Sequence, residues 1–398
     1  MKNSRLKILL TALIAGYSPL LMAQRGIPPK DVTRSVSVTR YAQVLEFSPE
    51  MVSLLKVPEG WKVSLAAAGL GKPRMLYTHN AGLYVTRRDG GDVLFLEDKN
   101  QDGKFDSNRA IVSDFKGVHG ITIKDNWLYL CNSTEVRRYP LKADGTVNSY
   151  AKQTLITDLP NGGQHPNRTM DFGPDGMLYI SVGSLCNDCK ESDKETAVIL
   201  QVDPKNWSRK VFASGLRNTI GFDWHPVTKA LWGVDNGGDA KGSDWPPEEV
   251  NNIMQGKDYG FPYAYGKREV DKSREDPAGN TKEAVVEGTE PSTLELTAHM
   301  APIGFTFFRG ASNIPSEWSA DALVAWHGSW NADKPVGFKV QRIHFQDGVA
   351  VKAEDFLSGF LQGGSRFGRP AGLSVSQSGV VYVSDDASGN IYAVQKIN

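Results

Sequence analysis

The residues best suited to proton transfer stand at a recurring position of this chain. His165 is followed three residues later by Arg168, and Arg217 with Asn218 occupies the matching place in the next stretch of similar sequence. An imidazole titrates near neutral pH and can take a proton from an alcohol. A guanidinium beside it would stabilise the negative charge that develops. We therefore predict His165 and Arg217 as catalytic residues. The alternatives are that His165 is a structural histidine beside a turn and that Arg217 forms a salt bridge between neighbouring repeats of the fold.

A second set of cationic and aromatic residues lies near the end of the chain. The segment SRFGRP carries Arg366 and Arg369, and HGSWNADK carries His327, Trp330 and Lys334. Arginine pairs with carboxylates through two parallel hydrogen bonds. Several cations with a large aromatic ring at one end of a channel suit a flat ligand with several negative charges. These residues are predicted to bind such a ligand; solvated surface charges are the alternative.

A Gly/Asp loop, DNGGDAKGSDWPPEEVNNI (235–253), is a candidate metal site. Hard cations such as calcium take carboxylate and backbone carbonyl oxygens as ligands. Gly237 and Gly238 permit carbonyl groups to turn inward toward such an ion.

The segment DKNQDGKFDSN (98–108) matches the first part of a calcium loop. The twelfth position is Arg109, where a calcium loop carries Glu, and no helical pattern flanks the segment. It therefore either binds a second calcium ion or forms a hairpin turn rich in Asx side chains. Its candidate ligands are Asp98, Asn100, Asp102 and Asp106.

The elements that must position these residues recur along the chain as pairs of short β runs around a Gly/Asp/Asn turn. Such self-similarity marks a repeat architecture, and paired strands of this kind suggest propeller blades. We predict an all-β fold, a six-bladed β-propeller of four-stranded antiparallel blades. The six units are MLYTHNAGLYVT (75–86), GITIKDNWLYLC (120–131), MDFGPDGMLYIS (170–181), IGFDWHPVTKALWGV (220–234), the looser pair GFTFF (304–308) with ALVAWHGSW (322–330), and GLSVSQSGVVYVS (372–384).

The residues that precede the six units explain why the candidates belong together. If each unit forms a blade, the segment leading into its inner strand reaches the same end of the central axis. Polar side chains at that position would then converge on a single pocket. The closing run, SGNIYAVQKIN, is expected to complete the first blade and leave no free edge. The residues at the repeated position are Arg74, His119, His165 with Arg168, Arg217 with Asn218, His299 and Arg369.

Residues 1–23 resemble an export signal, with three basic residues before an apolar stretch. An uncleaved membrane anchor is the alternative, although Gly16 and Pro19 interrupt the stretch. No later segment approaches the ~20 apolar residues that span a bilayer. We expect a periplasmic or secreted protein with a lead-in at 24–54 and a propeller domain at 55–398.

Charge and cysteine content narrow the function further. The chain has 45 basic and 45 acidic residues and no basic stripe, which argues against a nucleic-acid partner. Cys186 and Cys189 form a C-x-x-C that favours a local disulfide over a redox pair, because no βαβ pattern surrounds it. Zinc would need a second pair of ligands. Residue 190 is Lys, so the haem-attachment pattern C-x-x-C-H is absent.

Four stretches together resemble the soluble glucose/sorbosone dehydrogenase family: HPNRTMDFGPDGMLYISVGSLCNDC, GLRNTIGFDWHP, EEVNNIMQGKDYGFPYAYG and GRPAGLSVSQSGVVYVSDDASGNIY. Members of this family are six-bladed propellers that bind pyrroloquinoline quinone (PQQ) and calcium and oxidise sugars. The resemblance spans roughly residues 55–398. It is closer to the sorbosone-type branch, in which a Cys-containing insertion follows the VGS sequence.

The resemblance implies roles for the residues that match the family's motifs. His165 matches the general base, which takes the hydroxyl proton while hydride passes to the quinone. Arg217 matches the arginine over the quinone, and Asn218 a neighbouring polar contact. Where the glucose-oxidising branch carries an Asp that orients the histidine, this chain has Ser184.

The remaining matches concern the cofactors. Arg366 and Arg369 match the arginines that hold the PQQ carboxylates. The family lysine over PQQ has no clean counterpart, because the WHGSWNADK segment differs, and Lys334 is the candidate for it. Gly237 and Gly238 fall where backbone carbonyls ligate calcium.

The resemblance thus implies PQQ-dependent oxidation of an aldose or a sorbosone-like compound, with electrons passed to an external acceptor. Two alternatives stay open: a calcium-dependent lactonase-like hydrolase, and a non-catalytic propeller that binds a glycan or a protein. Lactonase sites gather Glu, Asp and Asn around the metal. The repeated position here carries mostly Arg and His, which suits an anionic cofactor better.

Overall fold

The structure, a computed structural model, describes residues 40–80, 82–100 and 102–397. The predicted signal peptide at 1–23 and most of the lead-in lie outside this range. No helix in the described range is long and apolar enough to cross a membrane.

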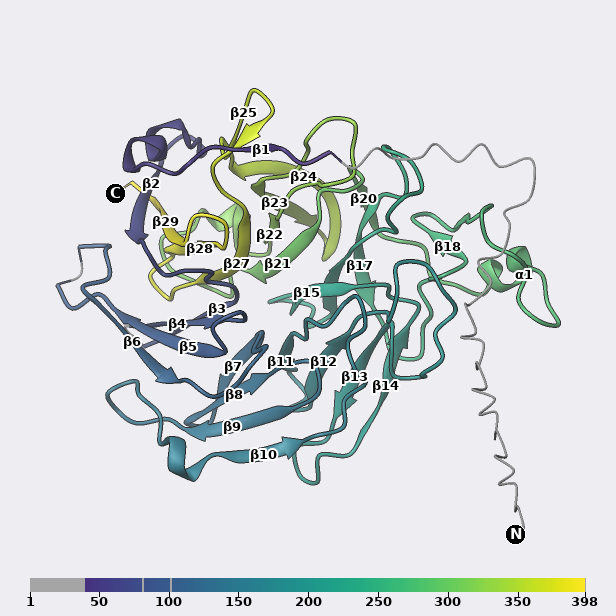
Figure 1. Ribbon diagram of the computed structural model, residues 1–398, viewed down its shortest axis with the longest axis horizontal. Coiled ribbons are helices and arrows are strands. Elements are labelled where there is room, and N and C mark those ends of the chain that lie inside the picture. The colour runs from purple at the N-terminus through teal and green to yellow at the C-terminus, as the bar shows by residue number, and fades with distance from the viewer. Residues whose placement is uncertain (1–39, 81, 101, 398) are drawn as a thin grey trace, which may run out of the picture. The chain divides into compact units, whose positions relative to one another are not determined.

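Six four-stranded antiparallel sheets make up most of the described chain, and we call them blades 1 to 6 (Figure 1). Blade 1 consists of β3 (Leu76–His79), β4 (Gly82–Arg87), β5 (Asp92–Glu97) and β6 (Ser107–Val112). Blade 2 consists of β7 (Gly120–Lys124), β8 (Trp127–Cys131), β9 (Val136–Pro140) and β10 (Gln153–Ile156). Blade 3 consists of β11 (Met170–Phe172), β12 (Leu178–Val182), β13 (Val198–Val202) and β14 (Arg209–Ser214). Blades 4 to 6 are β15 (Thr219–Trp224), β16 (Leu231–Asp235), β17 (Glu248–Ile253) and β20 (Leu294–Leu296); β21 (Pro302–Phe307), β22 (Ala322–Trp326), β23 (Lys339–Gln346) and β24 (Val349–Leu357); β27 (Pro370–Val375), β28 (Val381–Asp385), β29 (Asn390–Lys396) and β2 (Trp61–Ala67).

The inner strands of the blades contact one another in a closed cycle. Strand β3 contacts β7, β7 contacts β11, blade 3 contacts blade 4 through β12 and β15, and β15, β21, β27 and β3 follow in turn. In Figure 1 the inner strands lie around the centre of the ring of sheets. The six repeat units each supply the two inner strands of one blade, so the predicted six-bladed propeller is confirmed.

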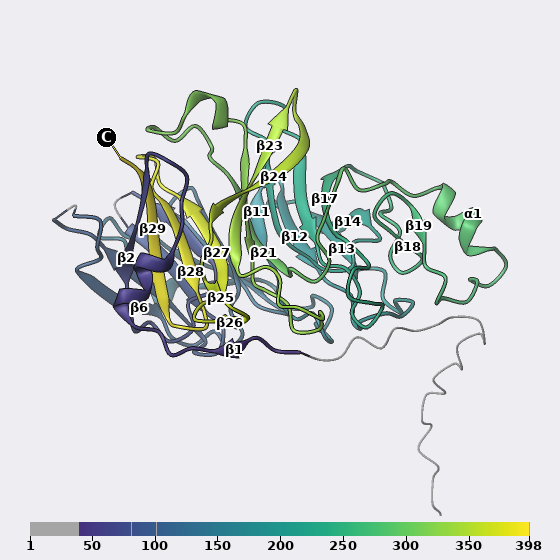
Figure 2. The same ribbon diagram turned by 90° about the horizontal axis from the view of Figure 1, so that it is seen from above.

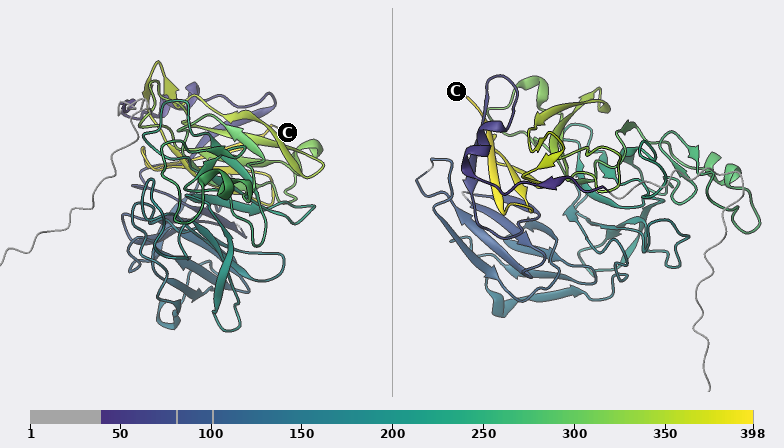
Figure 3. Two further views of the ribbon diagram at one scale, coloured as in Figure 1. Left: turned by 90° about the vertical axis from the view of Figure 1, so that its right-hand side faces the viewer. Right: turned by 45° about the horizontal axis from the view of Figure 1, so that its top comes forward.

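The ring closes by pairing strands from opposite ends of the chain. Strand β2 pairs antiparallel with β29 from Trp61 opposite Lys396 to Ala67 opposite Ile391. Figures 2 and 3 show the purple β2 beside the yellow C-terminal strands. The terminal strand β29 is therefore the third strand of blade 6, and the N-terminal β2 completes that blade rather than the first. A closed ring of this kind leaves no free edge between first and last blades.

Hydrophobic cores lie between neighbouring blades. Strands β12, β16 and β22 are buried along their whole length, as expected for sheets packed face to face. Near the axis the inner strands approach too closely for a side chain. A Cβ on Gly221 would lie 2.5 Å from the Ile303 carbonyl oxygen, and one on Gly372 would lie 2.1 Å from that of Arg74. The backbone ring at this level is therefore narrow and rigidly defined.

The remaining elements lie in the lead-in and in the loops. Strand β1 (Gln43–Val44) pairs in parallel with β26 (Ser365–Arg366), which pairs with β25 (Leu361–Gln362). Three short 3₁₀ helices are η1 (Pro49–Leu54), η2 (Ser149–Ala151) and η3 (Ser316–Trp318). The long loop after β17 holds the hairpin β18 (Ala264–Tyr265)–β19 (Glu269–Val270) and the helix α1 (Lys282–Glu287), which the sequence did not indicate.

Candidate active site

Hydrogen bonds join the segments that lead into neighbouring inner strands. Thr86 Oγ1 donates to the carbonyl oxygen of His119 over 3.0 Å, and His119 Nδ1 lies 3.1 Å from the carbonyl oxygen of Arg168. Ser384 Oγ of blade 6 donates to the carbonyl oxygen of Arg74 over 2.6 Å. These contacts join blades 6, 1, 2 and 3 in order. The repeated position of the sequence thus lies at one end of the axis.

His165 is held in one tautomer by Ser184, the residue that stands where the glucose-oxidising branch of the resembled family carries an Asp. Its Nδ1 lies 2.8 Å from the Ser184 carbonyl oxygen and 2.9 Å from Ser184 Oγ, which itself donates to the Cys186 carbonyl oxygen over 2.7 Å. A carbonyl oxygen only accepts, so Nδ1 carries the hydrogen and Nε2 the lone pair. Within the described residues Nε2 has no hydrogen-bond partner. Burial and the nearby Arg217 guanidinium lower the pKa of His165 to about 4, so the ring is neutral near pH 7.

Arg217 is 2% exposed and is held by two loops. Its Nε donates to the Asn187 carbonyl oxygen over 2.8 Å, and its Nη2 to Asn187 Oδ1 over 2.7 Å. Nη1 donates to the Asn236 carbonyl oxygen over 3.2 Å, and Nη2 lies 3.4 Å from Asp239 Oδ2. The guanidinium is thus fixed in orientation and keeps its positive charge close to His165.

Asn218 and His165 lie on either side of Gly183. A Cβ on Gly183 would lie 2.7 Å from His165 Cβ and 2.8 Å from Asn218 Oδ1, so the two side chains flank this glycine. Asn218 N–H donates to Asp235 Oδ1 over 2.9 Å. Burial raises the pKa of Asp235 to about 6.

Arg168 does not point into the site. It is fully buried, and it donates to the carbonyl oxygens of His165 (2.7 Å), Asn167 (3.2 Å) and Pro160 (3.0 Å). Burial lowers the pKa of Arg168 to about 10. Its role is to hold the loop that carries His165, and the guanidinium beside the imidazole is that of Arg217.

The C-terminal arginines line the same end of the axis. Arg369 donates from Nε to the His327 carbonyl oxygen and from Nη2 to that of Gly328, each over 2.9 Å. Burial lowers its pKa to about 10. Arg366 has a buried Nη1 atom without a hydrogen-bond partner within the described residues. A buried arginine N–H group that has no hydrogen-bond acceptor can pair with a bound anion.

Asp386 is a site residue that the sequence reasoning missed. Its carboxylate accepts from Arg74 Nη1 over 2.5 Å and from His327 Nε2 over 2.8 Å. Burial would raise the pKa of Asp386, but His327 and the Arg74 guanidinium outweigh burial and hold it well below its usual range. Arg74 was indicated by its position before a repeat unit, and His327 by the cationic and aromatic segment HGSWNADK. Asp386 follows a blade-6 strand with no pattern of its own to single it out.

Asp239 connects the two groups of arginines. Its Oδ1 accepts from Asn331 Nδ2 over 2.7 Å, while Oδ2 faces Arg217. Asn331 belongs to the loop at 327–334, whose carbonyl groups hold Arg369. His165, Arg217 and Arg369 therefore lie at the same end of the propeller, which is the arrangement that the sequence hypothesis requires.

Three other predicted residues lie at this end but are not part of the group formed by His165, Arg217 and Arg369. His299 is buried, and its Nε2 lies 2.7 Å from the Gly242 carbonyl oxygen, so it holds the loop between β16 and β17. Trp330 is 38% exposed and stacks on Tyr41 with ring centroids 6.4 Å apart. Lys334 is exposed and makes no ion pair within the described residues. Trp330 and Lys334 thus lie on the rim loop.

The buried carboxylate of Glu248 holds the Gly237–Gly238 loop. Glu248 accepts from Gly237 N–H over 3.0 Å and from Ala301 N–H over 2.8 Å, and burial raises the pKa of Glu248 to about 8. A Cβ on Gly238 would lie 2.8 Å from Tyr265 Oη, a buried hydroxyl without a partner in the described range. The carbonyl oxygens of Gly237 and Gly238 accept no hydrogen bond from the described residues. They are therefore free to bind a cation.

The second calcium candidate uses its side chains to bind its own backbone. Asp98 accepts from the N–H groups of Asp102 (3.2 Å) and Gly103 (2.9 Å). Asp106 accepts from Asn100 Nδ2 (3.2 Å) and Asn100 N–H (3.3 Å). Asx turns of this kind favour the hairpin interpretation of residues 98–108. Calcium binding at this loop stays a prediction.

The C-x-x-C forms the predicted local disulfide. Cys186 and Cys189 are bonded, with Cα atoms 6.0 Å apart, while Cys131 is free and buried. Within the described chain, the one close group of three metal-ligand side chains is these two cysteines with Glu191. The disulfide accounts for this group without a metal.

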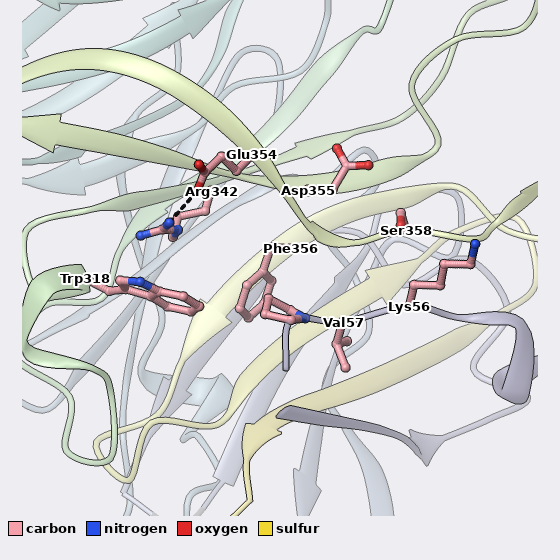
Figure 4. A pocket seen from close by; sticks show the side chains of 9 residues that line it. Lys56, Val57, Trp318, Arg342, Glu354, Asp355, Phe356 and Ser358 are labelled. Atoms are coloured by element: carbon pink, nitrogen blue, oxygen red, sulfur yellow. Dashed lines mark hydrogen bonds and ion pairs between the residues drawn. The ribbon is translucent and has the colours of Figure 1, made fainter. Parts of the chain in front are cut away.

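Two cavities lie away from the candidate residues. One of about 280 Å³ lies where blades 5 and 6 meet and is lined by Trp318, Arg342, Glu354 and Phe356 among others (Figure 4). Another, of about 620 Å³, is lined by the inner strands of all six blades and occupies the axis toward its opposite end. It contains none of the predicted site residues, although Met75 and Thr169 in its wall adjoin Arg74 and Arg168.

Comparison with known proteins gives consistent matches over nearly all of the described chain. The family model described as TrAA12-like matches residues 55–397. An uncharacterized protein of Borreliella burgdorferi is 31% identical over 360 residues, 87% of this chain and 92% of its own length. The PQQ-dependent sugar dehydrogenase of Hypocrea jecorina is 23% identical over 389 residues, 85% of this chain and 88% of its own. The holo PQQ domain of a Coprinopsis cinerea pyranose dehydrogenase superposes with a TM-score of 0.72 at 22% identity, covering 86% of this chain and 97% of that domain.

Proposed function

The chain belongs to the TrAA12-like family, and on that premise we propose that it is a PQQ-dependent sugar dehydrogenase, an oxidoreductase that acts on the CH–OH group of a sugar. The observation that carries the proposal is the position of His165 near Arg217, at the end of the axis where Arg366 and Arg369 also lie. A neutral imidazole, with its Nε2 free to accept a proton, thus lies in the field of a guanidinium of fixed orientation.

His165 has the properties of a general base. Two contacts from Ser184 keep the hydrogen on Nδ1, so the proton of a sugar hydroxyl can be accepted at Nε2. The guanidinium of Arg217 stabilises the negative charge that develops on the oxygen from which the proton departs.

The residues at this end fit PQQ, a flat molecule with several carboxylates. The fit rests on the unpaired Nη1 of Arg366, on the buried guanidinium of Arg369 and on Gly183, where any side chain would fill the space between His165 and Asn218. Arg366 and Arg369 would hold carboxylates, and Arg217 and Asn218 would contact the ring system. When bound, PQQ supplies the acceptor for the hydride. Trp330 and Lys334 on the rim would cover the cofactor from the solvent side.

Calcium would bind at the carbonyl oxygens of Gly237 and Gly238, which are free of hydrogen bonds from the described chain. Glu248 fixes the peptide on the N-terminal side of Gly237, so the loop is held for this purpose without a side-chain ligand.

The substrate would be an aldose or a sorbosone-like compound, and electrons would leave for an external acceptor. A periplasmic or secreted location fits the disulfide, which forms and persists in oxidising compartments.

Reconstitution tests the proposal directly. The purified protein is incubated with PQQ and calcium, and sugars are screened with an artificial acceptor dye. A stoichiometric quinone absorbance and dye reduction by one or more sugars are expected. The His165→Ala variant should bind PQQ but lose turnover by about 10²- to 10⁴-fold.

Two results would overturn the proposal. One is a protein that gains no quinone absorbance with PQQ and calcium. The other is hydrolysis of lactones without added quinone, which would favour the lactonase-like alternative.

A further inference from the structure

The loop between β12 and β13 carries groups that hold both proposed catalytic residues. It contains Ser184, the partner of His165, and the disulfide between Cys186 and Cys189, with Asn187 and Asp188 enclosed between the two cysteines. We call residues 183–197 the disulfide loop.

Asn187 is the centre of this arrangement. Its backbone carbonyl oxygen accepts from Arg217 Nε, and its Oδ1 accepts from Arg217 Nη2. The same Oδ1 accepts from Asp239 N–H over 2.8 Å, and Nδ2 donates to the Asp239 carbonyl oxygen over 3.0 Å. One residue therefore ties the guanidinium to the backbone that directly follows Gly238.

The disulfide loop also fixes the base. The Cys186 carbonyl oxygen accepts from Ser184 Oγ, which is in contact with His165 Nδ1. A change in the backbone at Cys186 would therefore reach His165 through Ser184 and Arg217 through Asn187.

Ion pairs hold the far side of the disulfide loop. Asp188 lies 2.7 Å from Lys241 Nζ and 3.3 Å from Arg274 Nη1. Lys241 also lies 2.5 Å from Asp271, and its side chain is 5% exposed. These pairs anchor the disulfide loop to Lys241, between β16 and β17, and to Arg274, in the long loop after β17. The backbone at Asn187 is therefore held from both sides.

We propose that Asn187 is a positioning residue for Arg217 and for the Gly237–Gly238 loop, and that the Cys186–Cys189 disulfide is the clasp that keeps Asn187 in place. The inference rests on the proposed function. It makes the oxidation state of one short-range disulfide a condition for full activity.

Reduction opens the clasp in a balanced step. Two electrons and two protons convert the Sγ–Sγ bond to two thiols, and dithiothreitol supplies both while it closes to its cyclic disulfide. The chain on either side of Asn187 is then free to move, and Arg217 loses a fixed carbonyl acceptor.

The first experiment compares Asn187→Ala with Asn313→Ala. Asn313 Nδ2 also bridges two loops, by donating to the Ser378 carbonyl oxygen over 3.2 Å, but it follows β21 at the opposite end of the axis. Its φ of 58° makes alanine unfavourable there, so this control is destabilised without touching the site.

Four quantities are measured for wild type and each variant: the thermal midpoint of the cofactor-free protein, PQQ affinity by absorbance titration with calcium present, kcat, and KM. We expect Asn187→Ala to weaken PQQ binding and to lower kcat by at least tenfold, because contacts to a charged group are lost. Asn313→Ala should change both by less than twofold. Asn187→Asp keeps the Oδ1 acceptor and should recover part of the loss in kcat.

The second experiment opens the clasp. Dithiothreitol on the reconstituted wild type, with thiols counted by maleimide labelling, should lower kcat in the same direction as Asn187→Ala. The Cys186→Ser/Cys189→Ser variant should show a similar loss and no further response to dithiothreitol. Adding Asn187→Ala to that variant should cost less than the product of the separate losses, because both changes act through the same contacts.

The outcomes separate the two proposals. A wild type that binds PQQ and turns over sugar, with Asn187→Ala unchanged, overturns the role of Asn187. Full activity after verified reduction overturns the clasp. A wild type that binds no PQQ overturns the proposed function, and this inference with it.

Discussion

Arg217 supplies both charge and geometry beside His165, and two substitutions separate them. Burial and the Arg217 charge lower the pKa of His165 from an ordinary 6.5 to about 4. The difference corresponds to roughly 3 kcal/mol in favour of the neutral imidazole. A base with a lowered pKa is active above that pKa and loses activity as the pH falls through it. In the wild type, kcat/KM is therefore expected to fall on the acid side of the pH profile with a midpoint near pH 4. We call this fall the acid limb.

Arg217→Met removes the charge, so the acid limb should move upward from pH 4. It should stop short of 6.5, because burial is the larger cause and persists. Arg217→Lys keeps the charge but loses the planar fork that contacts Asn187. Its limb should stay near pH 4 while kcat falls by about 10- to 100-fold at every pH.

The assay is kcat/KM from pH 3.5 to 8 with PQQ and calcium in excess and an acceptor dye whose reduction does not depend on pH. The position of the limb, rather than its height, carries the information. An unshifted limb in Arg217→Met would refute the assignment of Arg217 as a cause of the low pKa. A wild-type limb near 6.5 would refute the buried, neutral state of His165.

Three further predictions concern other parts of the chain. Gly183→Ala places a methyl group 2.7 Å from His165 Cβ and should lower PQQ affinity at least tenfold in an absorbance titration, with KM for the dye unchanged. Trp61→Ala removes a buried ring stacked 5.3 Å from Trp318 and should lower the free energy of unfolding by about 3 to 5 kcal/mol in urea; a loss below about 1 kcal/mol would contradict it. Asp106→Ala should leave the number of bound calcium ions unchanged by elemental analysis, because its oxygens cap backbone N–H groups; a loss of one ion would show that the 98–108 loop binds metal.

The sequence predicted the blades well because blade strands are local in the chain. Each repeat unit contains two adjacent strands and the turn between them, so a period in the sequence corresponds directly to a hairpin. The position before each unit likewise placed His165, Arg217 and Arg369 at one end. The partner of β29 was harder to assign, since nothing in the pattern of Trp61–Ala67 says which blade it joins.

The sequence did not predict which way each side chain points. Arg168 occupies the repeated position but turns into the blade, where it binds three carbonyl groups. Asp386 and Asp239 come from loops, which have no periodicity to mark them. His165 is oriented largely by a backbone carbonyl, and backbone acceptors leave no signature in the residue types.

The pairing of β2 with β29 has a consequence for how the protein is made. Strand β2 is synthesised long before its partner β29, because the strands of the five other blades lie between them, so blade 6 stays incomplete until β29 has been made. The chain must bring two strands that are far apart in the sequence together, a slow step during which apolar strands stay exposed. Any translation stop before Asn390 therefore yields an open, aggregation-prone chain rather than a smaller working enzyme.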